Sequence, residues 1–537
     1  MAGATFVIFE QKDRVLVFNK INKMNYNFSP LTKVLKVDGH YYGYDAASRL
    51  LCELDEVSAG CLSSDCSASV PEALERLLER GVFTTPDFKQ CTVNTEDLPQ
   101  MIAYNMEHTF PKRFVLEVTE SCNLRCKYCF NTIGDGNRVH TSRQMDEETA
   151  FAAIDYYFKC FTTKLSQIKE TDRKDYLKKI KPVFSLWGGE PFLNFRLIQK
   201  AKAYFDGLPW KDFGVDKEDI ICSIVTNFTI FNDEILDFLV KNKILLSVSF
   251  DGSRYAHDMN RIFADGHGSF DIVKSHLDKL YSTAFDYCHS HVLIQAVYDG
   301  EESLKKSQSF FKEFLYDEQQ KKKFIGIFYI HQSKPKEQID FSFSEEEKKR
   351  SVDLFKEKMS ELSLLPESEL DKKVRTGEIV VNDYLVLLKK EKKLCLDRPI
   401  ASDRCARTFS CPIGTSQIAV GVTGDLHVCY KSDESYPIGN VKTGGLDARK
   451  LVRMYSEYYA NFQSNCKKCW AYRFCQKCPS EMLKNGKFIK ASREECNFVR
   501  DLTEVELLKY ILLASNDKLY NFFKRYISYY QQEIVYV

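Results

Sequence analysis

The chain has 537 residues, of which 44% are hydrophobic and 28% are charged, so it is long enough for two to four domains with buried cores. Its 76 basic and 75 acidic residues nearly cancel, giving a net charge of +1. This balance argues against nucleic acid as the main partner, because proteins that follow a phosphate backbone usually carry a basic surplus or stripe.

Targeting signals are not evident in the sequence. No apolar run reaches the roughly 20 residues that span a bilayer, and Met1 to Thr5 lack the basic and apolar regions of a signal peptide. We therefore expect a cytoplasmic protein that does not enter a membrane. In a reducing compartment, 19 cysteines at short spacings favour metal binding over disulfides.

Residues 1–100 are predicted to form a small unit of strands and helices. The expected elements are, in order, a hairpin, an extended stretch and two helices, over Thr5–Glu10 with Val15–Asn19, Thr32–Gly43, Ala46–Leu54 and Pro71–Gly81. The second helix has Pro near its start and Gly at its end, as helices prefer. A generic capping unit remains an alternative to a binding domain here.

Three cysteines follow the apolar run Phe114–Val118 directly: Cys122, Cys126 and Cys129. Because three and two residues separate them, one loop can wrap all three thiolates around a single iron-sulfur cluster. Three ligands for four irons leave one iron open to a small molecule, as an open zinc position does in catalytic zinc sites. A zinc knuckle or a chance group of buried thiols is the alternative.

With its preceding strand and with Tyr128 before the last cysteine, this loop resembles the cluster loop of the radical S-adenosylmethionine (radical SAM) superfamily. The resemblance implies a [4Fe-4S] cluster whose fourth iron binds SAM and, once reduced, cleaves it to a 5'-deoxyadenosyl radical.

Residues 101–330 alternate apolar strands with amphipathic helices. The strands are expected at Phe114–Val118, Pro182–Trp187, Ile220–Val225, Leu245–Phe250, His291–Val297 and Phe324–Ile330. The helices are expected near Asp146–Lys164, Arg196–Phe205, Asp233–Lys241, Phe270–Tyr281 and Glu302–Phe314. This order predicts an α/β fold, a partial parallel (β/α)6 barrel with its site at the carboxyl ends of the strands. The Lys-rich piece 164–181 is expected to be a solvated helical insert.

Several strand ends carry the polar or glycine residues that such a site needs. Gly188, Gly189 and Glu190 end the second strand, where glycines let a backbone approach closely and a carboxylate can accept an ammonium group. They resemble the Gly-Gly-Glu-Pro segment that holds the methionine part of SAM in the superfamily. By the same resemblance, Asn227, Ser249 and Asp251 line the SAM pocket; helix or turn capping is the alternative for each.

His257 and Arg261 follow the fourth strand, in segments similar to those of the peptide-modifying branch of the superfamily. Arg261 could clamp a carboxylate of SAM or of a substrate. A surface ion pair is the alternative. No residue can be assigned as a catalytic base.

A second set of cysteines lies in residues 401–500: Cys405, Cys411, Cys429, Cys466, Cys469, Cys475, Cys478 and Cys496. Eight thiolates are what two fully ligated [4Fe-4S] clusters need, although two four-cysteine zinc sites would use the same number. The other eight cysteines are expected to be ordinary thiols: Cys52, Cys61, Cys66, Cys91, Cys160, Cys222, Cys288 and Cys395.

This region resembles the SPASM domain of radical SAM enzymes, including Gly424 before Cys429 and the segment Gly439–Val441. The resemblance implies interleaved ligands. Cluster I would use Cys405, Cys411, Cys429 and Cys478, and cluster II would use Cys466, Cys469, Cys475 and Cys496. Only Gln476 and Lys477 separate the last two cysteines of the block, whereas three residues are usual in the family, which weakens the assignment of Cys478 to cluster I.

The remaining regions complete the expected architecture. Residues 331–400 are predicted to be a charged helical bridge, with a helix over Phe343–Leu362, and residues 501–537 are predicted to be helices rich in Tyr and Phe. The element order of residues 1–100 resembles the winged-helix domains that bind the leader of a ribosomally made precursor peptide by adding it to a sheet edge.

Together the resemblances imply a radical SAM/SPASM peptide maturase of the thioether-forming type. Its cofactors would be three [4Fe-4S] clusters and SAM, and its partners a precursor peptide and an electron donor such as flavodoxin or ferredoxin. If all eight later cysteines are ligands, no auxiliary iron is open to a substrate thiol, which favours an electron-transfer role for the auxiliary clusters.

Other activities stay open. An anaerobic sulfatase-maturating enzyme makes formylglycine, but that type has an acidic residue after the cysteine equivalent to Cys429, where this chain has Tyr430. A carbon-carbon crosslink, an epimerisation, a nucleic-acid-modifying radical enzyme and a non-catalytic zinc-rich scaffold are the further alternatives.

Overall fold

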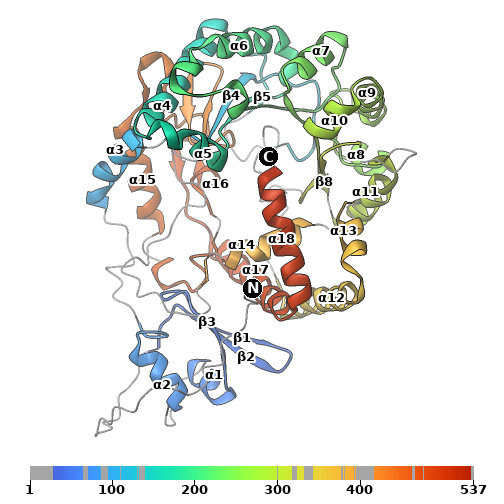
Figure 1. Ribbon diagram of the computed structural model, residues 1–537. Helices are drawn as coiled ribbons and strands as arrows, with labels where there is room; N and C mark the ends of the chain where they lie inside the picture. Colours follow the sequence, from blue (N-terminus) through green and yellow to red (C-terminus); the bar gives the residue numbers. More distant parts are fainter. Residues whose placement is uncertain are drawn as a thin grey trace.

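The computed structural model (Figure 1) describes most of the chain. The described residues are 28–63, 70–85, 95–108, 110–129, 131, 139–298, 300–316, 323–331, 343–375, 379, 381–391, 393–394, 417–462, 466–475 and 477–533. Among them, no helix is long and apolar enough to cross a membrane.

A ten-stranded sheet forms the centre of the molecule, in the order β13-β12-β11-β10-β4-β5-β6-β7-β8-β9. Six parallel strands, adjacent in chain order, run from its middle to the edge strand β9. They are β4 (Arg113–Thr119), β5 (Val183–Gly188), β6 (Ile221–Thr226), β7 (Leu245–Ser249), β8 (Val292–Tyr298) and β9 (Gly326–His331). Each lies within two residues of its predicted range, so the predicted strand order and the partial parallel barrel are confirmed.

Helices cover the outer face of these strands (Figure 1). They are α4 (Glu147–Ser166), α5 (Glu170–Ile180), α6 (Phe195–Gly207), α7 (Asp233–Lys241), α8 (Arg254–Asp258), α9 (Phe270–Thr283), α10 (Phe285–His291) and α11 (Gly300–Phe314). Helix α4 begins where Asp146 accepts a hydrogen bond from the Thr149 N–H at 2.7 Å, and its Tyr157 stacks on Phe114 of β4. The Lys-rich insert is helix α5, as predicted.

The Cys-rich region contributes four strands to the same sheet, which the sequence did not predict. Strand β10 (Gln417–Val420) pairs in parallel with β4, and three short antiparallel strands follow it: β11 (Asp425–His427), β12 (Gly439–Asn440) and β13 (Gly445–Leu446). Gly445 has a φ of +90°, and a Cβ there would meet the Tyr156 ring of α4 at 2.1 Å. Only glycine therefore lets this edge lie against α4.

The amino-terminal unit contains a three-stranded antiparallel sheet and two helices. Their bounds are β1 (Thr32–Val37), β2 (His40–Asp45), β3 (Leu51–Leu54), α1 (Glu56–Ser63) and α2 (Glu72–Glu79). Helix α2 confirms the prediction over Pro71–Gly81. The predicted hairpin within residues 5–19 lies outside the described residues.

Two expectations for this unit are wrong. The predicted helix near Ala46–Leu54 is a turn followed by β3, because Asp45 holds the turn and Arg49 takes a positive φ of 66°. Cys61 is disulfide-bonded rather than an ordinary thiol. The extended stretch predicted over Thr32–Gly43 is a β1–β2 hairpin that turns at Asp38 and Gly39.

The later part of the chain is mainly helical. They are α12 (Glu345–Leu364), α13 (Glu367–Arg375), α14 (Val381–Glu391), α17 (Arg493–Ala514) and α18 (Asp517–Glu533), and they confirm the helices predicted for both regions. The remaining elements are α3 (Leu98–His108), α15 (Ala448–Phe462), α16 (Pro479–Met482), β14 (Leu483–Lys484) and β15 (Lys487–Phe488). Apolar residues of β1, β2, α12, α14, α17 and α18 share one hydrophobic core, so residues far apart in the sequence bury each other.

Candidate active site

The loop of Cys122, Cys126 and Cys129 begins two residues after β4, at the carboxyl edge of the sheet. Its main chain is fixed to the segment after α8: the Arg125 N–H donates to the Ile262 carbonyl at 2.7 Å, and the Lys127 N–H donates to the Asn260 carbonyl at 3.1 Å. These bonds hold the loop over the strand ends.

The three thiols lie near one another and are half-buried. Burial raises the pKa of Cys122 to about 12 and that of Cys126 to about 11. Cys122 also feels the charges of Cys126 and Cys129, and Cys126 feels that of Cys129. Thiolates are therefore unfavourable here unless a cation such as iron binds them. N–H donors already approach the Cys122 sulfur, from Leu124 N at 3.4 Å and Asn227 Nδ2 at 3.8 Å, as is usual for cluster sulfurs.

No group of three metal-ligating side chains in the described residues has the geometry of a site for one metal ion. A [4Fe-4S] cluster does not require such a group, because each cysteine binds a different iron and the sulfurs stay apart. Three thiols on one loop with N–H donors to a sulfur are a donor set that fits a cluster.

A buried ion pair anchors the loop from the opposite side. Asp251 is fully buried, and its Oδ2 accepts from the Tyr128 hydroxyl at 2.7 Å and from Arg261 Nε at 2.9 Å. The main-chain N–H of Val297 donates to its Oδ1 at 2.8 Å. Although burial alone would lower it, the Asp251 charge raises the pKa of Arg261. Arg261 also hydrogen-bonds Cys126, so three sequence-predicted residues, Tyr128, Asp251 and Arg261, meet at the loop.

His257 is buried directly behind this pair. The Asp251 N–H donates to its Nδ1 at 3.2 Å, so the other nitrogen carries the proton and donates to Ser269 Oγ at 2.9 Å. Ser269 in turn donates to the Arg261 carbonyl. Burial and the Arg261 charge hold the pKa of His257 well below its usual range. The ring therefore braces Asp251 and Arg261 as a neutral group.

Gly188 and Gly189 bring two backbones together. A Cβ at Gly188 would lie 2.3 Å from the Thr119 carbonyl oxygen, and one at Gly189 would lie 2.4 Å from that of Ser121. The Gly189 N–H donates to Thr119 and the Glu190 N–H donates to Ser121. In this structure the glycines let β5 approach the start of the cysteine loop, a constraint that the sequence reasoning attributed to a ligand.

Glu190 links β5 to β6. Its Oε1 accepts from the Thr226 hydroxyl at 2.7 Å, and its Oε2 accepts from the Asn227 N–H at 2.7 Å. Burial outweighs these hydrogen bonds and raises the pKa of Glu190 to about 7. Asn227 passes the connection onward, because its Nδ2 donates to Asn123 Oδ1 at 3.0 Å. Ser249 ends β7 and is half-buried.

The sequence reasoning missed a second anchor. Arg143 forms ion pairs with the buried Glu120 at 2.7 Å and with Glu434 of the Cys-rich region at 3.2 Å. His140 Nδ1 lies 3.1 Å from the Glu120 carbonyl, and its Nε2 lies 3.7 Å from the Cys129 sulfur. No pattern around Arg143 indicates this role, because its partners lie 23 and 291 residues away in the sequence.

The later cysteines fall partly within the described residues. Cys405 and Cys411 lie outside them. Cys496 feels the charges of Cys475 and Cys469, so three proposed ligands of cluster II lie near one another. The loops that carry Cys429 and Cys478 meet where Ser432 Oγ donates to Ser480 Oγ at 3.4 Å.

The side chain of Tyr430 packs against two neighbouring side chains. Its ring lies 4.9 Å from that of Trp187, the residue before Gly188, and the Arg113 guanidinium lies 5.7 Å from its centre. The residue that replaces the acidic group of the sulfatase-maturating type therefore belongs to an aromatic and cationic cluster.

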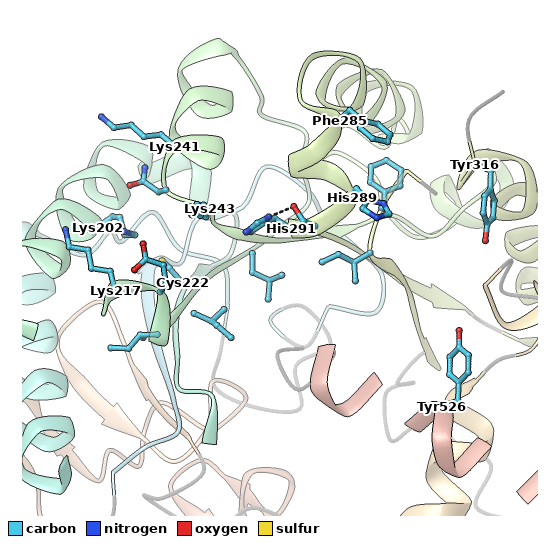
Figure 2. A pocket seen from close by; sticks show the side chains of 18 of the residues that line it. Lys202, Lys217, Cys222, Lys241, Lys243, Phe285, His289, His291, Tyr316 and Tyr526 are labelled. Carbon is cyan, nitrogen blue, oxygen red and sulfur yellow. Dashed lines mark hydrogen bonds between the residues drawn. The ribbon is translucent and has the colours of Figure 1, made fainter. Parts of the chain in front are cut away.

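A cavity of about 1690 Å³ opens at the other end of the strands (Figure 2). It lies at the amino ends of β6, β7 and β8, and helices α13 and α18 contribute to its wall. Figure 2 shows Lys217 and Lys202 on one side and Tyr316 and Tyr526 on the other. Since the cysteine loop lies at the carboxyl ends, this cavity is separate from the candidate active site.

Residues 116–305 match the family model described as the Radical SAM superfamily. These residues form a radical SAM domain. The domain implies a [4Fe-4S] cluster and SAM as cofactors, and the matched residues include Cys122, Cys126 and Cys129.

Three curated relatives match parts of the chain. An uncharacterised protein of Methanocaldococcus jannaschii is 30% identical over 32% of this chain and 51% of its own length. The radical SAM cyclopropyl synthase TigE of Paramaledivibacter caminithermalis is 26% identical over 38% of this chain and 44% of its own length. A cysteine-type anaerobic sulfatase-maturating enzyme of Clostridium novyi is 25% identical over 36% of this chain and 46% of its own length. The chain thus spans about half the length of the curated relatives it matches.

The solved structure of anSMEcpe with bound AdoMet is similar over more of the chain. It matches 75% of this chain and 99% of its own, with 19% sequence identity and a TM-score of 0.49.

The Asp251→Asn substitution tests the buried ion pair. It leaves the Arg261 charge without a counter-ion, so we expect a loss of about 3–5 kcal/mol in the free energy of unfolding. We also expect fewer irons per chain, because the cysteine loop loses its anchor. Melting temperature and iron content of anaerobically prepared protein measure both effects.

The matched control is Asp271→Asn, which breaks an exposed ion pair with Arg254. Exposed pairs contribute only about 0–1 kcal/mol, so this variant should behave like the parent protein. Equal melting temperatures for the two variants would contradict the anchoring role.

His257 gives the protein a predicted pH dependence. Its folded-state pKa is lowered, so below a pH of about 6.5 the unfolded chain binds a proton that the folded chain does not. The contribution of His257 to the free energy of unfolding should therefore fall by about 1.4 kcal/mol per pH unit below that point. The difference in stability between the parent protein and His257→Gln should shrink as pH falls from neutrality, measured by thermal denaturation.

The exposed His267 provides the control position for this measurement. A His267→Gln variant that showed the same shrinking difference would refute the assignment to His257.

Proposed function

We propose that this chain is a radical SAM peptide maturase that installs a crosslink, a Cys thioether, in a ribosomally made precursor peptide. The observation that carries the proposal is the joint presence of a radical SAM domain and a second cysteine set joined to its sheet through β10. The curated relatives include a sulfatase-maturating enzyme, which supports a polypeptide as substrate.

The chain's own residues would divide the work at the SAM site. Cys122, Cys126 and Cys129 would hold the cluster, and the Gly188–Glu190 segment with Asn227, Ser249 and Asp251 would form the SAM pocket. When bound, a reduced [4Fe-4S] cluster with SAM supplies a 5'-deoxyadenosyl radical. Arg261 and His257 would act as positioning residues, because each is buried and bonded within the protein.

The auxiliary cysteines would hold two further clusters. Cys469, Cys475 and Cys496 lie together, which supports a cluster II that also includes Cys466. The link between the Cys429 and Cys478 loops supports a cluster I with Cys405 and Cys411. This gives three [4Fe-4S] clusters and about twelve irons per chain, with a flavodoxin or ferredoxin as electron donor.

The three-stranded amino-terminal sheet would bind the leader of the precursor. An edge strand offers unpaired N–H and C=O groups to which an extended peptide can add. The leader-binding domain, the bridge of residues 331–400 and the cytoplasmic location of the enzyme are parts of the same proposal.

A carbon-carbon bond is the second candidate product, since TigE is a cyclopropyl synthase. Formylglycine formation is the third, because of the sulfatase-maturating relative. Tyr430 argues against it, because its ring packs on Trp187 and offers no carboxylate.

Replacing Cys126 by Ala should abolish SAM cleavage and peptide modification together, because two thiols cannot hold the cluster in place. Cys160→Ala, at a half-buried thiol of α4 outside both cysteine sets, is the control and should keep both. 5'-Deoxyadenosine and peptide product are measured by chromatography after anaerobic reaction. Retained cleavage in Cys126→Ala would show that the ligand assignment is wrong.

Mass spectrometry of a co-expressed precursor should show the loss of two hydrogens and of one alkylatable thiol. For a thioether, a carbon would give a hydrogen atom to the 5'-deoxyadenosyl radical and the thiol would lose a proton as the carbon-sulfur bond forms. The surplus electron would go to a cluster held by the auxiliary cysteines. A carbon-carbon bond would leave the thiol reactive, formylglycine would react with a hydrazide, and epimerisation would leave the mass unchanged. Any of these three results would replace the thioether proposal.

A further inference from the structure

The proposed ligands of cluster II come from two segments. Cys469 and Cys475 belong to a compact loop whose main chain folds on itself, with the Cys475 N–H donating to Ala471 at 3.0 Å. Cys496 lies in the first turn of α17, whose start is capped by the Ser492 side chain. Both segments also touch the amino-terminal sheet.

The loop is bonded to the turn that follows β2. Asp45 is fully buried and accepts from the N–H groups of Ala47 at 3.2 Å and Ser48 at 3.0 Å, which fixes the turn. The Ala46 carbonyl accepts from the Tyr472 hydroxyl at 3.2 Å and from Arg473 Nε.

Arg473 donates hydrogen bonds to two carbonyls of the turn. A second guanidinium nitrogen, Nη2, donates to the Ala47 carbonyl at 3.2 Å. The planar guanidinium thus bonds two consecutive carbonyls, a geometry that a lysine cannot reproduce. Arg473 lies between Cys469 and Cys475 in sequence. A movement of the turn would therefore displace the chain two residues from Cys475.

Aromatic and charged contacts extend the junction to α17. Tyr44 of β2 lies 5.3 Å from Phe474 and 6.4 Å from Trp470, ring centre to ring centre. Lys33 of β1 pairs with Glu504 of α17 at 2.8 Å, and its ammonium lies 5.6 Å from the Trp470 ring. The sheet therefore contacts the loop and the helix that supply the cysteines.

We propose that Arg473 is a positioning residue that locks the Cys469–Cys475 loop onto the amino-terminal sheet, so that the sheet and the auxiliary cluster stabilise each other. Loss of the cluster loosens the sheet, and release of the sheet speeds the loss of iron. This inference rests on the assignment of Cys469, Cys475 and Cys496 to an auxiliary cluster in the proposed function. By linkage, a peptide that binds the sheet also changes the stability of the cluster.

The test uses the full-length protein with its clusters assembled anaerobically. We expect Arg473→Ala to raise two rates by about ten-fold: amide hydrogen exchange at residues 44–50, and iron release to a ferrous chelator. The loss of a charged hydrogen bond to a carbonyl corresponds to at least that factor. The faster release should concern about four irons per chain, those of one cluster. Arg473→Lys should show smaller increases in both rates than Arg473→Ala. It keeps the test valid if the Ala variant folds poorly.

The control is Arg453→Ala, which removes an exposed arginine that pairs with Glu457 within α15 and should change neither readout. The reverse experiment is Cys475→Ser, which should lose about four irons and raise exchange at residues 44–50. Unchanged exchange in Cys475→Ser, or unchanged iron release in Arg473→Ala, would overturn the proposal.

An unchanged iron content in Cys475→Ser would overturn both this proposal and the ligand assignment. No readout uses the modified peptide. Failure to find a peptide product would therefore reject the proposed function without affecting the result on Arg473.

Discussion

The buried pair of Asp251 and Arg261 is the interaction on which the candidate active site depends. Burying two charges costs several kcal/mol per ion, and the cost is offset only where further hydrogen bonds satisfy both groups. Here the Tyr128 hydroxyl and the Val297 N–H donate hydrogen bonds to the Asp251 carboxylate. His257 accepts a hydrogen bond from the Asp251 N–H and so holds its main chain. The pair joins β7, β8 and the cysteine loop, so the position of the thiols follows from the packing of the barrel.

Much of this arrangement could be predicted from the sequence because it is local. The strands are continuous apolar runs, and the cysteines, Gly188 and Asp251 follow them directly. Chain order thus placed them at one edge of a parallel sheet. Their individual contacts could not be predicted. The glycines serve the approach of β5 to the residues after β4, and Glu190 bonds to Thr226 and Asn227, because three-dimensional register decides which neighbours meet.

Long-range features escaped sequence reasoning for the same reason. Strand β10 is four residues long and pairs with β4 from about 300 positions further along the chain, so no periodicity indicates where it docks. The helix expected near Ala46–Leu54 has apolar residues at helical spacing, but pairing with β2 gives Leu51–Leu54 better burial as a strand. Tertiary contacts overrode local propensity there. Arg143 joins Glu120 to Glu434 by contacts that no motif encodes.

The two cysteine sets are held by different physical means. The first lies on one loop, fixed by main-chain hydrogen bonds and one buried ion pair within a single barrel. The described cysteines of the second set are distributed over the segment after β11, the loop before α16 and the first turn of α17. A group that binds all of them joins those parts, so its binding energy contributes to the assembly of the whole chain. The second set therefore depends on packing between distant parts of the chain, including the contacts of Arg473 with the amino-terminal turn, whereas the first depends on contacts within one barrel.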